Sequence, residues 1–436
     1  MARKKTVDII TMGCSKNLVD SERLIKMFER AGYTAHHNPS EVKSQIVVIN
    51  TCGFIGDAKQ ESIDMILECC QAKEQGAVKK VYVMGCLSQR YAQELPESIP
   101  EVDGWFGKFD WKGILGEIND ETASPQWERT LTTPPHYTYL KIAEGCNRFC
   151  AFCAIPLITG RYKSRPIEEI VEETRELVGK GVREFNVIAQ DLTYYGLDLY
   201  GKQRIADLVD AIAQVEGVKW IRLHYAYPTQ FPYDLLPVMA RHKNVCRYMD
   251  IALQHISDKV LENMRRHITG AETRELLRRM RAEVPGIHIR TTLMVGFPGE
   301  GEKEYQELID FVKEQRFERM GAFAYCEEDD TYAAKHFADD IPAEVKERRL
   351  SHLMEIQEEI SLEHNQEKIG LTVPVVIDSK NEEYYVGRTE WDSPEVDNEV
   401  LVSIANTPKL EIGKVYDIEL IEAMPFELIG KLKENV

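Results

Sequence analysis

Six strand-like segments alternate with helix-like segments over the middle of the chain, and this alternation limits the possible folds more than any other feature. Short runs rich in Val, Ile and aromatic residues are typical of strands, and the amphipathic segments between them are long enough for helices. A strand–helix–strand order predicts a parallel sheet with right-handed crossovers. Six units are too few for an eight-stranded barrel, so we predict an open, partial (β/α)6 barrel. The strand candidates are residues 137–146, 184–191, 218–225, 247–254, 288–297 and 319–326.

The segments on either side have other patterns, and 436 residues are too many for one ordinary core. The first part also alternates strand and helix, which predicts an N-terminal parallel α/β domain with strands near 6–12, 45–50 and 80–84. The last part contains short strands and turns without helices, which predicts a small antiparallel β-barrel of the OB-like type. The predicted boundaries are 1–120 for the N-terminal domain, 121–136 for a polar linker, 137–368 for the barrel domain and 369–436 for the C-terminal barrel.

Each predicted strand of the N-terminal domain is followed at once by a cysteine, namely Cys14, Cys52 or Cys86. Parallel strands end at one edge of a sheet, and open α/β sheets bind their ligands at that edge. The three thiols are therefore expected to converge. The start of the chain has no apolar stretch typical of a secretory signal, so we interpret the ten cysteines as reduced thiols, metal ligands or catalytic groups rather than disulfides.

A second set of cysteines follows the first strand of the predicted barrel. The stretch "GCNRFCAFC" places Cys146, Cys150 and Cys153 in a C-x3-C-x2-C array. Three thiolates on one loop can hold three irons of a [4Fe–4S] cluster, which usually has four cysteine ligands, and leave the fourth iron open for a ligand. A structural zinc site favours four ligands, often in C-x2-C pairs, and a chance group of core cysteines would not enclose polar residues. The array therefore favours an iron–sulfur cluster over both alternatives.

This array after the first strand of a partial βα barrel resembles the radical S-adenosylmethionine (SAM) superfamily. The resemblance implies that the open iron binds SAM and that one-electron reduction cleaves SAM to methionine and a 5′-deoxyadenosyl radical, which abstracts hydrogen from a C–H bond. Further candidates for the SAM pocket are Gln190, after the second barrel strand, and Gly296 and Gly299 of "GFPGE". A strand-end cap for Gln190 and a plain turn for the glycines are the alternatives.

The whole chain resembles the methylthiotransferase family, because an N-terminal domain with three cysteines precedes the radical SAM barrel and a TRAM-type barrel follows it. The stretches "MGCSKNLVDSE", "NTCGFI" and "GCLSQRY" match the three N-terminal motifs of that family. The resemblance implies a second [4Fe–4S] cluster on Cys14, Cys52 and Cys86, which holds the sulfur to be inserted. It also implies two SAM molecules, one as methyl donor and one as radical source, a sulfur donor, and an electron donor of the flavodoxin or ferredoxin type.

Two branches of this family modify different substrates. One acts on an adenosine of tRNA, and the other acts on the β-carbon of an aspartate in a basic small-subunit ribosomal protein of the uS12 family. The tRNA branch more often has Met at the place of Lys16 and a basic residue after the second cysteine, where this chain has Phe54 and Ile55. These residues favour the ribosomal-protein branch.

Charge points the same way. The net charge is −18, and the residues from 370 onward include 14 acidic and 6 basic ones. An acidic barrel suits a basic protein partner better than a nucleic acid, so we expect no tRNA substrate. The alternatives that remain are tRNA methylthiolation and a two-cluster electron-transfer or scaffold protein.

We further expect a cytoplasmic protein without a membrane segment. The remaining cysteines lack ligand spacing and are expected to be buried thiols; they are Cys69, Cys70, Cys246 and Cys326.

Overall fold

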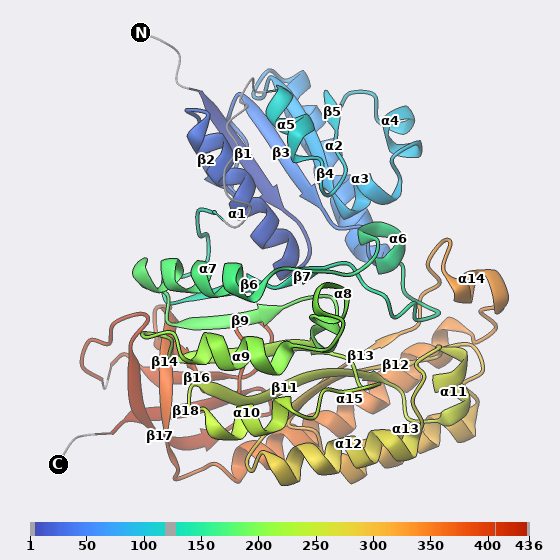
Figure 1. Ribbon diagram of the computed structural model, residues 1–436, viewed down its shortest axis with the longest axis vertical. Helices are drawn as coiled ribbons and strands as arrows, with labels where there is room; N and C mark the ends of the chain where they lie inside the picture. Colours follow the sequence, from blue (N-terminus) through green and yellow to red (C-terminus); the bar gives the residue numbers. More distant parts are fainter. Residues whose placement is uncertain (1–4, 118–127, 406, 434–436) are drawn as a thin grey trace.

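The computed structural model describes residues 5–117, 128–405 and 407–433. It contains a five-stranded sheet, a six-stranded sheet and a closed five-stranded barrel, in that order along the chain. Figure 1 shows the first sheet with its helices above the six-stranded sheet and the small barrel below and to one side. No helix in the described part of the chain is long and apolar enough to cross a membrane.

The N-terminal sheet is parallel, with the order β2-β1-β3-β4-β5. Its strands are β1 (Thr6–Thr11), β2 (Thr34–His37), β3 (Ile46–Thr51), β4 (Lys80–Gly85) and β5 (Gly104–Trp105). Its helices are α1 (Ser15–Arg30), α2 (Gly56–Glu74), α3 (Cys86–Arg90), α4 (Glu94–Ser98) and α5 (Trp111–Glu117). The three predicted strands form the centre, where β3 is buried along its whole length because both faces are covered. The sequence did not indicate β2 and β5, which are short edge strands.

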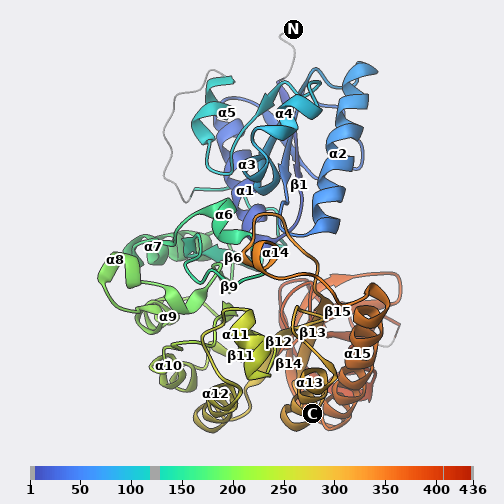
Figure 2. The ribbon, with the colours of Figure 1, turned by 90° about the vertical axis from the view of Figure 1, so that its right-hand side faces the viewer.

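The second sheet confirms the predicted open barrel. Its six strands are parallel and follow the order β6-β9-β10-β11-β12-β13, which leaves β6 and β13 at the two edges. The strands are β6 (Tyr137–Lys141), β9 (Glu184–Ile188), β10 (Trp220–Ala226), β11 (Val245–Gln254), β12 (His288–Val295) and β13 (Arg319–Ala324). The helices on its outer face are α7 (Ile167–Gly179), α9 (Ile205–Ala213), α10 (Leu235–Arg241), α12 (Gly270–Glu283), α13 (Glu302–Gln315) and α15 (Ala343–Gln366). Figure 2 shows these helices wrapping around the sheet.

Shorter elements lie in the loops of this domain. They are β7 (Ala143–Glu144), α6 (Ile155–Thr159), β8 (Lys163–Ser164), η1 (Leu192–Tyr194), α8 (Leu197–Tyr200), α11 (Asp258–Asn263) and α14 (Tyr332–His336). Residues 121–127 of the predicted linker lie outside the described residues. Beyond them, Arg129 is buried and pairs with Glu22 of α1 and with Glu173 of α7, so this part of the segment packs at the domain junction.

The C-terminal barrel closes in the order β14-β15-β16-β18-β17. Its strands are β14 (Thr372–Lys380), β15 (Tyr384–Arg388), β16 (Glu399–Ser403), β17 (Val415–Ala423) and β18 (Glu427–Leu432). The sequence indicated four of these strands and missed β18. A closed barrel with an odd number of strands needs at least one parallel pair, and β16 and β18 form it, whereas the other pairs are antiparallel as predicted.

The two outer domains dock at opposite ends of the strands of the six-stranded sheet: the C-terminal barrel at their amino ends and the N-terminal domain at their carboxyl ends. Arg388 of the C-terminal barrel makes a buried ion pair with Glu184, the first residue of β9. Asp20 of α1 instead pairs with Lys141, the last residue of β6. The N-terminal domain therefore covers the carboxyl edge of the strands, where enzymes with βα barrels place their active sites.

Candidate site at the domain junction

The structure brings the three predicted N-terminal thiols together. Cys14 precedes α1, Cys52 follows β3, and Cys86 begins α3 directly after β4. A Cβ atom on Gly13 would lie 2.8 Å from the Cys52 sulfur, and the φ of +81° at Gly13 also requires glycine. Burial raises the pKa of Cys86 to about 12, and the nearby Cys14 and Cys52 thiols contribute to this rise. The turns after the three strands thus converge.

A buried cation, which the sequence did not single out, lies beside this N-terminal trio. Lys108 Nζ is 3.1 Å from Asp20 Oδ2 and 3.2 Å from Asn17 Oδ1, and that same amide oxygen is 3.7 Å from the Cys86 sulfur. Burial disfavours the charge, yet Asp20, Glu144 and the thiols hold the pKa of Lys108 well above its usual range. Lys108 therefore places a permanent positive charge against the cysteines.

The same charge acts on Cys14. Burial raises the pKa of this thiol, but Lys16 and Lys108 lower it, and the result lies below the usual value. Burial raises the pKa of Cys52 instead. Cys14 is therefore the member of the trio that loses its proton most readily.

The barrel trio lies on the loop between β7 and α6. The backbone N–H of Cys146 donates to the Gly160 carbonyl at 3.2 Å, and that of Cys153 donates to the Cys150 carbonyl at 3.0 Å. Burial raises the pKa of Cys146 to about 12, and the Cys150 thiol adds to the rise. Burial also raises the pKa of Cys153, with contributions from both other thiols. The three thiols therefore lie near one another.

Two arginines support this loop, and the sequence singled out neither. Arg266 Nη1 is 3.3 Å from the Cys150 sulfur, and its guanidinium carbon lies 4.0 Å from the centre of the Tyr227 ring. Arg148, between two of the cysteines, donates from Nε to Asp191 Oδ2 at 2.6 Å and lies 4.4 Å from the same ring. Arg266 is far from the cysteines in sequence and carries no motif that could have revealed it.

The two trios meet across the domain junction. Cys86 lies in one small apolar cluster with Ala154, the residue after Cys153, and Ile158. A buried chain of polar groups runs beside this contact, in the order Lys108, Asp20, Lys141, Glu144 and Gln190. Burial raises the pKa of Asp20, but Lys141 and Lys108 lower it to about 2 overall. The junction is thus both packed and electrostatically bridged.

Both thiol sets suit an iron–sulfur cluster chemically. All six thiols are free, and each trio adjoins a buried cation that can offset the negative charge of a thiolate-ligated cluster. Among the described residues, no three His, Cys, Asp or Glu side chains converge on the position of one ion. A cube does not require this convergence, because each thiolate binds a different iron.

The structure also shows the surroundings of the three residues that the sequence suggested for the SAM pocket. Gln190 donates to Glu144 in the polar chain. A Cβ on Gly296 would lie 2.4 Å from Lys346 Cγ, and one on Gly299 would lie 2.5 Å from an Asn263 nitrogen. Both glycines also have φ near +72° and +95°, so close packing and a turn account for them.

The four remaining cysteines lie outside both trios. Cys326 is exposed, contrary to the prediction of a buried thiol, because it follows β13 at the open edge of the sheet, whereas Cys69, Cys70 and Cys246 are buried as predicted.

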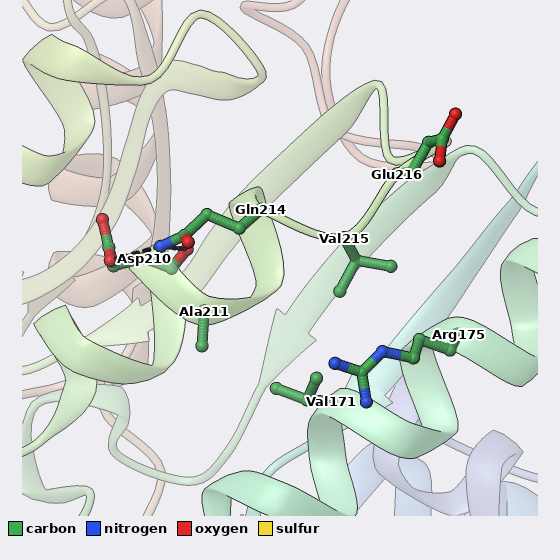
Figure 3. A pocket seen from close by; sticks show the side chains of 7 residues that line it. All are labelled: Val171, Arg175, Asp210, Ala211, Gln214, Val215 and Glu216. Carbon is green, nitrogen blue, oxygen red and sulfur yellow. Dashed lines mark hydrogen bonds between the residues drawn. The ribbon is translucent and has the colours of Figure 1, made fainter.

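A surface pocket of about 450 Å³ lies between α7 and α9, and none of its lining residues is a cysteine (Figure 3). This pocket is separate from the thiols.

Family comparisons match all three parts of the chain. The radical SAM superfamily matches residues 140–312, the "Uncharacterized protein family UPF0004" matches 6–107, and the TRAM domain matches 369–432. The radical SAM match supports an iron–sulfur cluster and SAM as cofactors.

Solved structures with similar folds include the radical SAM methyltransferase TsrM from Kitasatospora setae. It has 14% identity and a TM-score of 0.53, and the match covers 74% of this chain and 72% of TsrM. The cobalamin-dependent SAM radical enzyme OxsB has 12% identity and a TM-score of 0.51, with 82% of this chain and 58% of OxsB covered. At these identities the likeness establishes the fold alone.

Full-length relatives are much more similar. The ribosomal protein uS12 methylthiotransferase RimO of Parabacteroides distasonis is 57% identical over 99% of both chains. RimO of Porphyromonas gingivalis is 56% identical over 99% of both chains, and RimO of Christiangramia forsetii is 51% identical over 98% of this chain and 94% of its own. The chain therefore belongs to the RimO family of radical SAM methylthiotransferases, as its motifs predicted.

Proposed function

We propose that the protein adds a methylthio group to the β-carbon of an aspartate in ribosomal protein uS12. The names of its full-length relatives, the N-terminal motifs and the acidic C-terminal barrel support this substrate. A basic ribosomal protein and an acidic enzyme attract each other over long range, which favours productive encounter. The reaction would take place in the cytoplasm, where thiols stay reduced.

The proposed ligands are the two cysteine trios, one for each of two [4Fe–4S] clusters. When bound, the barrel cluster would supply one-electron reduction of SAM, and the N-terminal cluster would supply the binding position for the sulfur. Arg266 and Lys108 offset the charge of their respective trios. Arg148, held by Asp191 and the Tyr227 ring, fixes the conformation of the cysteine loop.

The overall change replaces one C–H bond of the aspartate by a C–S bond. The hydrogen leaves with the 5′-deoxyadenosyl group of one SAM, and the methyl group on sulfur comes from a second SAM. A sulfur donor supplies sulfide-level sulfur, and an electron donor of the flavodoxin or ferredoxin type supplies the electron that cleaves the first SAM. Formation of the C–S bond from the substrate radical and the methylthiolate releases one electron, so the overall change needs no further oxidant. The residues Gln190, Gly296 and Gly299 remain candidates for the neighbourhood of SAM.

One observation supports this proposal most directly: Cys86 shares one small apolar cluster with Ala154 and Ile158, so the two proposed cluster sites would adjoin the same junction. Sulfur can reach the substrate carbon only if both sites adjoin the same space. A scaffold or simple electron-transfer protein would not need this arrangement.

The test uses the anaerobically reconstituted protein with SAM, sulfide and a chemical reductant, together with either uS12 or tRNA. We expect uS12 to gain the mass of one methylthio group in place of hydrogen, with the group mapped to an aspartate by fragmentation. A mass gain on tRNA alone would establish the adenosine-modifying alternative. If SAM is not cleaved to 5′-deoxyadenosine, the protein is an electron-transfer or scaffold protein.

A further inference from the structure

Lys16 of α1 lies at the junction of the two domains. It is the second residue after Cys14, and its ammonium nitrogen is 3.5 Å from the centre of the Tyr225 ring. Tyr225 belongs to β10, near the carboxyl end of that strand. The pair therefore crosses from the N-terminal domain to the barrel, next to the N-terminal thiols.

Unlike Lys108, Lys141 and Arg148, Lys16 has no carboxylate partner among the residues that the structure describes. Lys108 and Lys141 share Asp20, and Arg148 pairs with Asp191. The Lys16 side chain is half-buried and favours the Cys14 thiolate, but no carboxylate among the described residues offsets its partial removal from water. The chain has a net charge of −18, so carboxylates are abundant, yet none pairs with Lys16 among the described residues. An anionic group of a bound molecule could neutralise this ammonium.

Tyr225 holds the ammonium in place. Its ring packs beside Val19 and Ile188, and its backbone has a φ of +66°, which a tyrosine rarely adopts. Its N–H donates to Asp250 Oδ2 at 3.3 Å. Strained backbone held by its surroundings is common at ligand-binding positions, and an aromatic face attracts a cation without neutralising it.

A second polar group beside Lys16 also lacks a partner. The hydroxyl of Ser15 is buried, and the described residues offer it no hydrogen-bond partner. Buried hydroxyls are nearly always paired, so this oxygen has an unused donor. The first turn of α1 thus presents an unpaired cation and an unpaired donor next to Cys14.

We propose that the ammonium of Lys16 binds the side-chain carboxylate of the substrate aspartate and thereby selects it. This inference rests on the proposed function. An aspartate brings one negative charge into a junction where Lys16 can neutralise it, whereas an adenosine base brings none. Lys16 therefore determines specificity for the acidic substrate.

The test compares two forms of recombinant uS12. One is the natural protein, and the other carries asparagine at the aspartate that the wild-type enzyme modifies, identified by mass spectrometry. Binding to fluorescently labelled uS12 is followed by anisotropy, and KM and kcat are measured separately for the natural form. The enzyme variants are Lys16→Met and Lys16→Arg. The control is Lys26→Met, which removes a lysine from the same helix that lies 3.8 Å from Glu29.

We expect Lys16→Met to weaken binding of natural uS12 by about tenfold or more, as loss of a charge-assisted bond predicts, with the change in KM rather than kcat. Binding of the asparagine form should stay the same, which also shows that the variant is folded. Lys16→Arg should restore most of the affinity, and Lys26→Met should behave as wild type.

Other outcomes overturn the inference in distinguishable ways. If Lys16→Met weakens both uS12 forms equally, or neither, Lys16 does not recognise the carboxylate although the proposed function stands. If the change appears in kcat alone, Lys16 acts on the thiols rather than on the substrate. If the wild-type enzyme modifies no aspartate of uS12, the proposed function and the inference both fall.

Discussion

Cys86, the first residue after β4 of the N-terminal sheet, shares one small apolar cluster with Ala154, which directly follows Cys153 of the barrel loop. The two residues are 68 positions apart in sequence; one belongs to the N-terminal cysteine trio and the other follows the barrel trio, so the proposed cluster sites lie on either side of one junction. The placement of the N-terminal domain is therefore part of the proposed site. A substitution that weakens the contacts between the two domains should therefore reduce the transfer of sulfur even when each domain remains folded.

The first prediction concerns Glu328, which joins the loop after β13 to the N-terminal domain. This buried carboxylate accepts from Arg90 at 2.7 Å and from Lys59 at 2.9 Å. Glu328→Gln should weaken the junction by about 3 kcal/mol, because it leaves two cations without their counter-charge. Local amides of α3 should then exchange hydrogen roughly 150-fold faster by mass spectrometry.

The neighbouring Glu327→Gln is the matched control, because Glu327 is exposed and forms no ion pair among the described residues. The α3 amides of this control variant should exchange hydrogen at the wild-type rate. Equal exchange in the two variants would show that Glu328 does not hold the domains together.

The second prediction concerns the protonation of the N-terminal thiols. In metal-free protein, Cys14 should react with iodoacetamide at lower pH than Cys86, because the pKa of Cys14 is lowered and that of Cys86 is raised to about 12. Lys108→Met should move the reaction of Cys14 to higher pH, since Lys108 favours its thiolate. Peptide mapping after alkylation at a series of pH values measures both effects. An unchanged pH profile in the variant would remove Lys108 from the electrostatics of the trio.

The third prediction concerns the contact between the six-stranded sheet and the C-terminal barrel. His288, the first residue of β12, stacks on Trp391 with ring centres 4.7 Å apart. Burial and then Lys368 lower the pKa of His288 to about 3. A lowered folded-state pKa means that the unfolded chain takes up a proton first, so stability is present above pH 6.5 and is lost as the pH falls toward 3.

Between pH 7.5 and pH 5 this loss amounts to about 2 kcal/mol at most, because one pKa unit corresponds to about 1.4 kcal/mol. Thermal unfolding at the two pH values measures it, and His288→Gln should reduce the difference. His336→Gln, which changes a histidine on α14, is the control and should keep the wild-type difference. If His288→Gln and the control lose the same stability in acid, His288 does not cause the effect.

The sequence was sufficient for the parts of the fold that depend on periodicity. All six barrel strands, the three central N-terminal strands and four strands of the C-terminal barrel lie where apolar runs indicated them. The edge strands β2 and β5 are too short to show a pattern. The strand β18 follows β17 after a brief turn and contains Gly430, which weakens its strand signal.

The site could be predicted only in part, for a related reason. The cysteines could be placed because each follows a strand, and strand ends meet at one edge of a parallel sheet. Lys108 and Arg266 lie in loops, and their proximity to the thiols depends on how the chain folds back. Single-sequence patterns carry no signal for such contacts. The orientation of the two domains was likewise beyond the sequence, since it depends on paired residues such as Asp20 and Lys141.

The iron content of anaerobically reconstituted protein tests the central claim most directly. The comparison includes the wild type, a variant with Cys14, Cys52 and Cys86 changed to alanine, and a variant with Cys146, Cys150 and Cys153 changed to alanine. The account predicts about eight irons in the wild type and about four in each variant, as expected for two independent [4Fe–4S] clusters. A wild-type content of about four irons, with none in one of the variants and no change in the other, would contradict it.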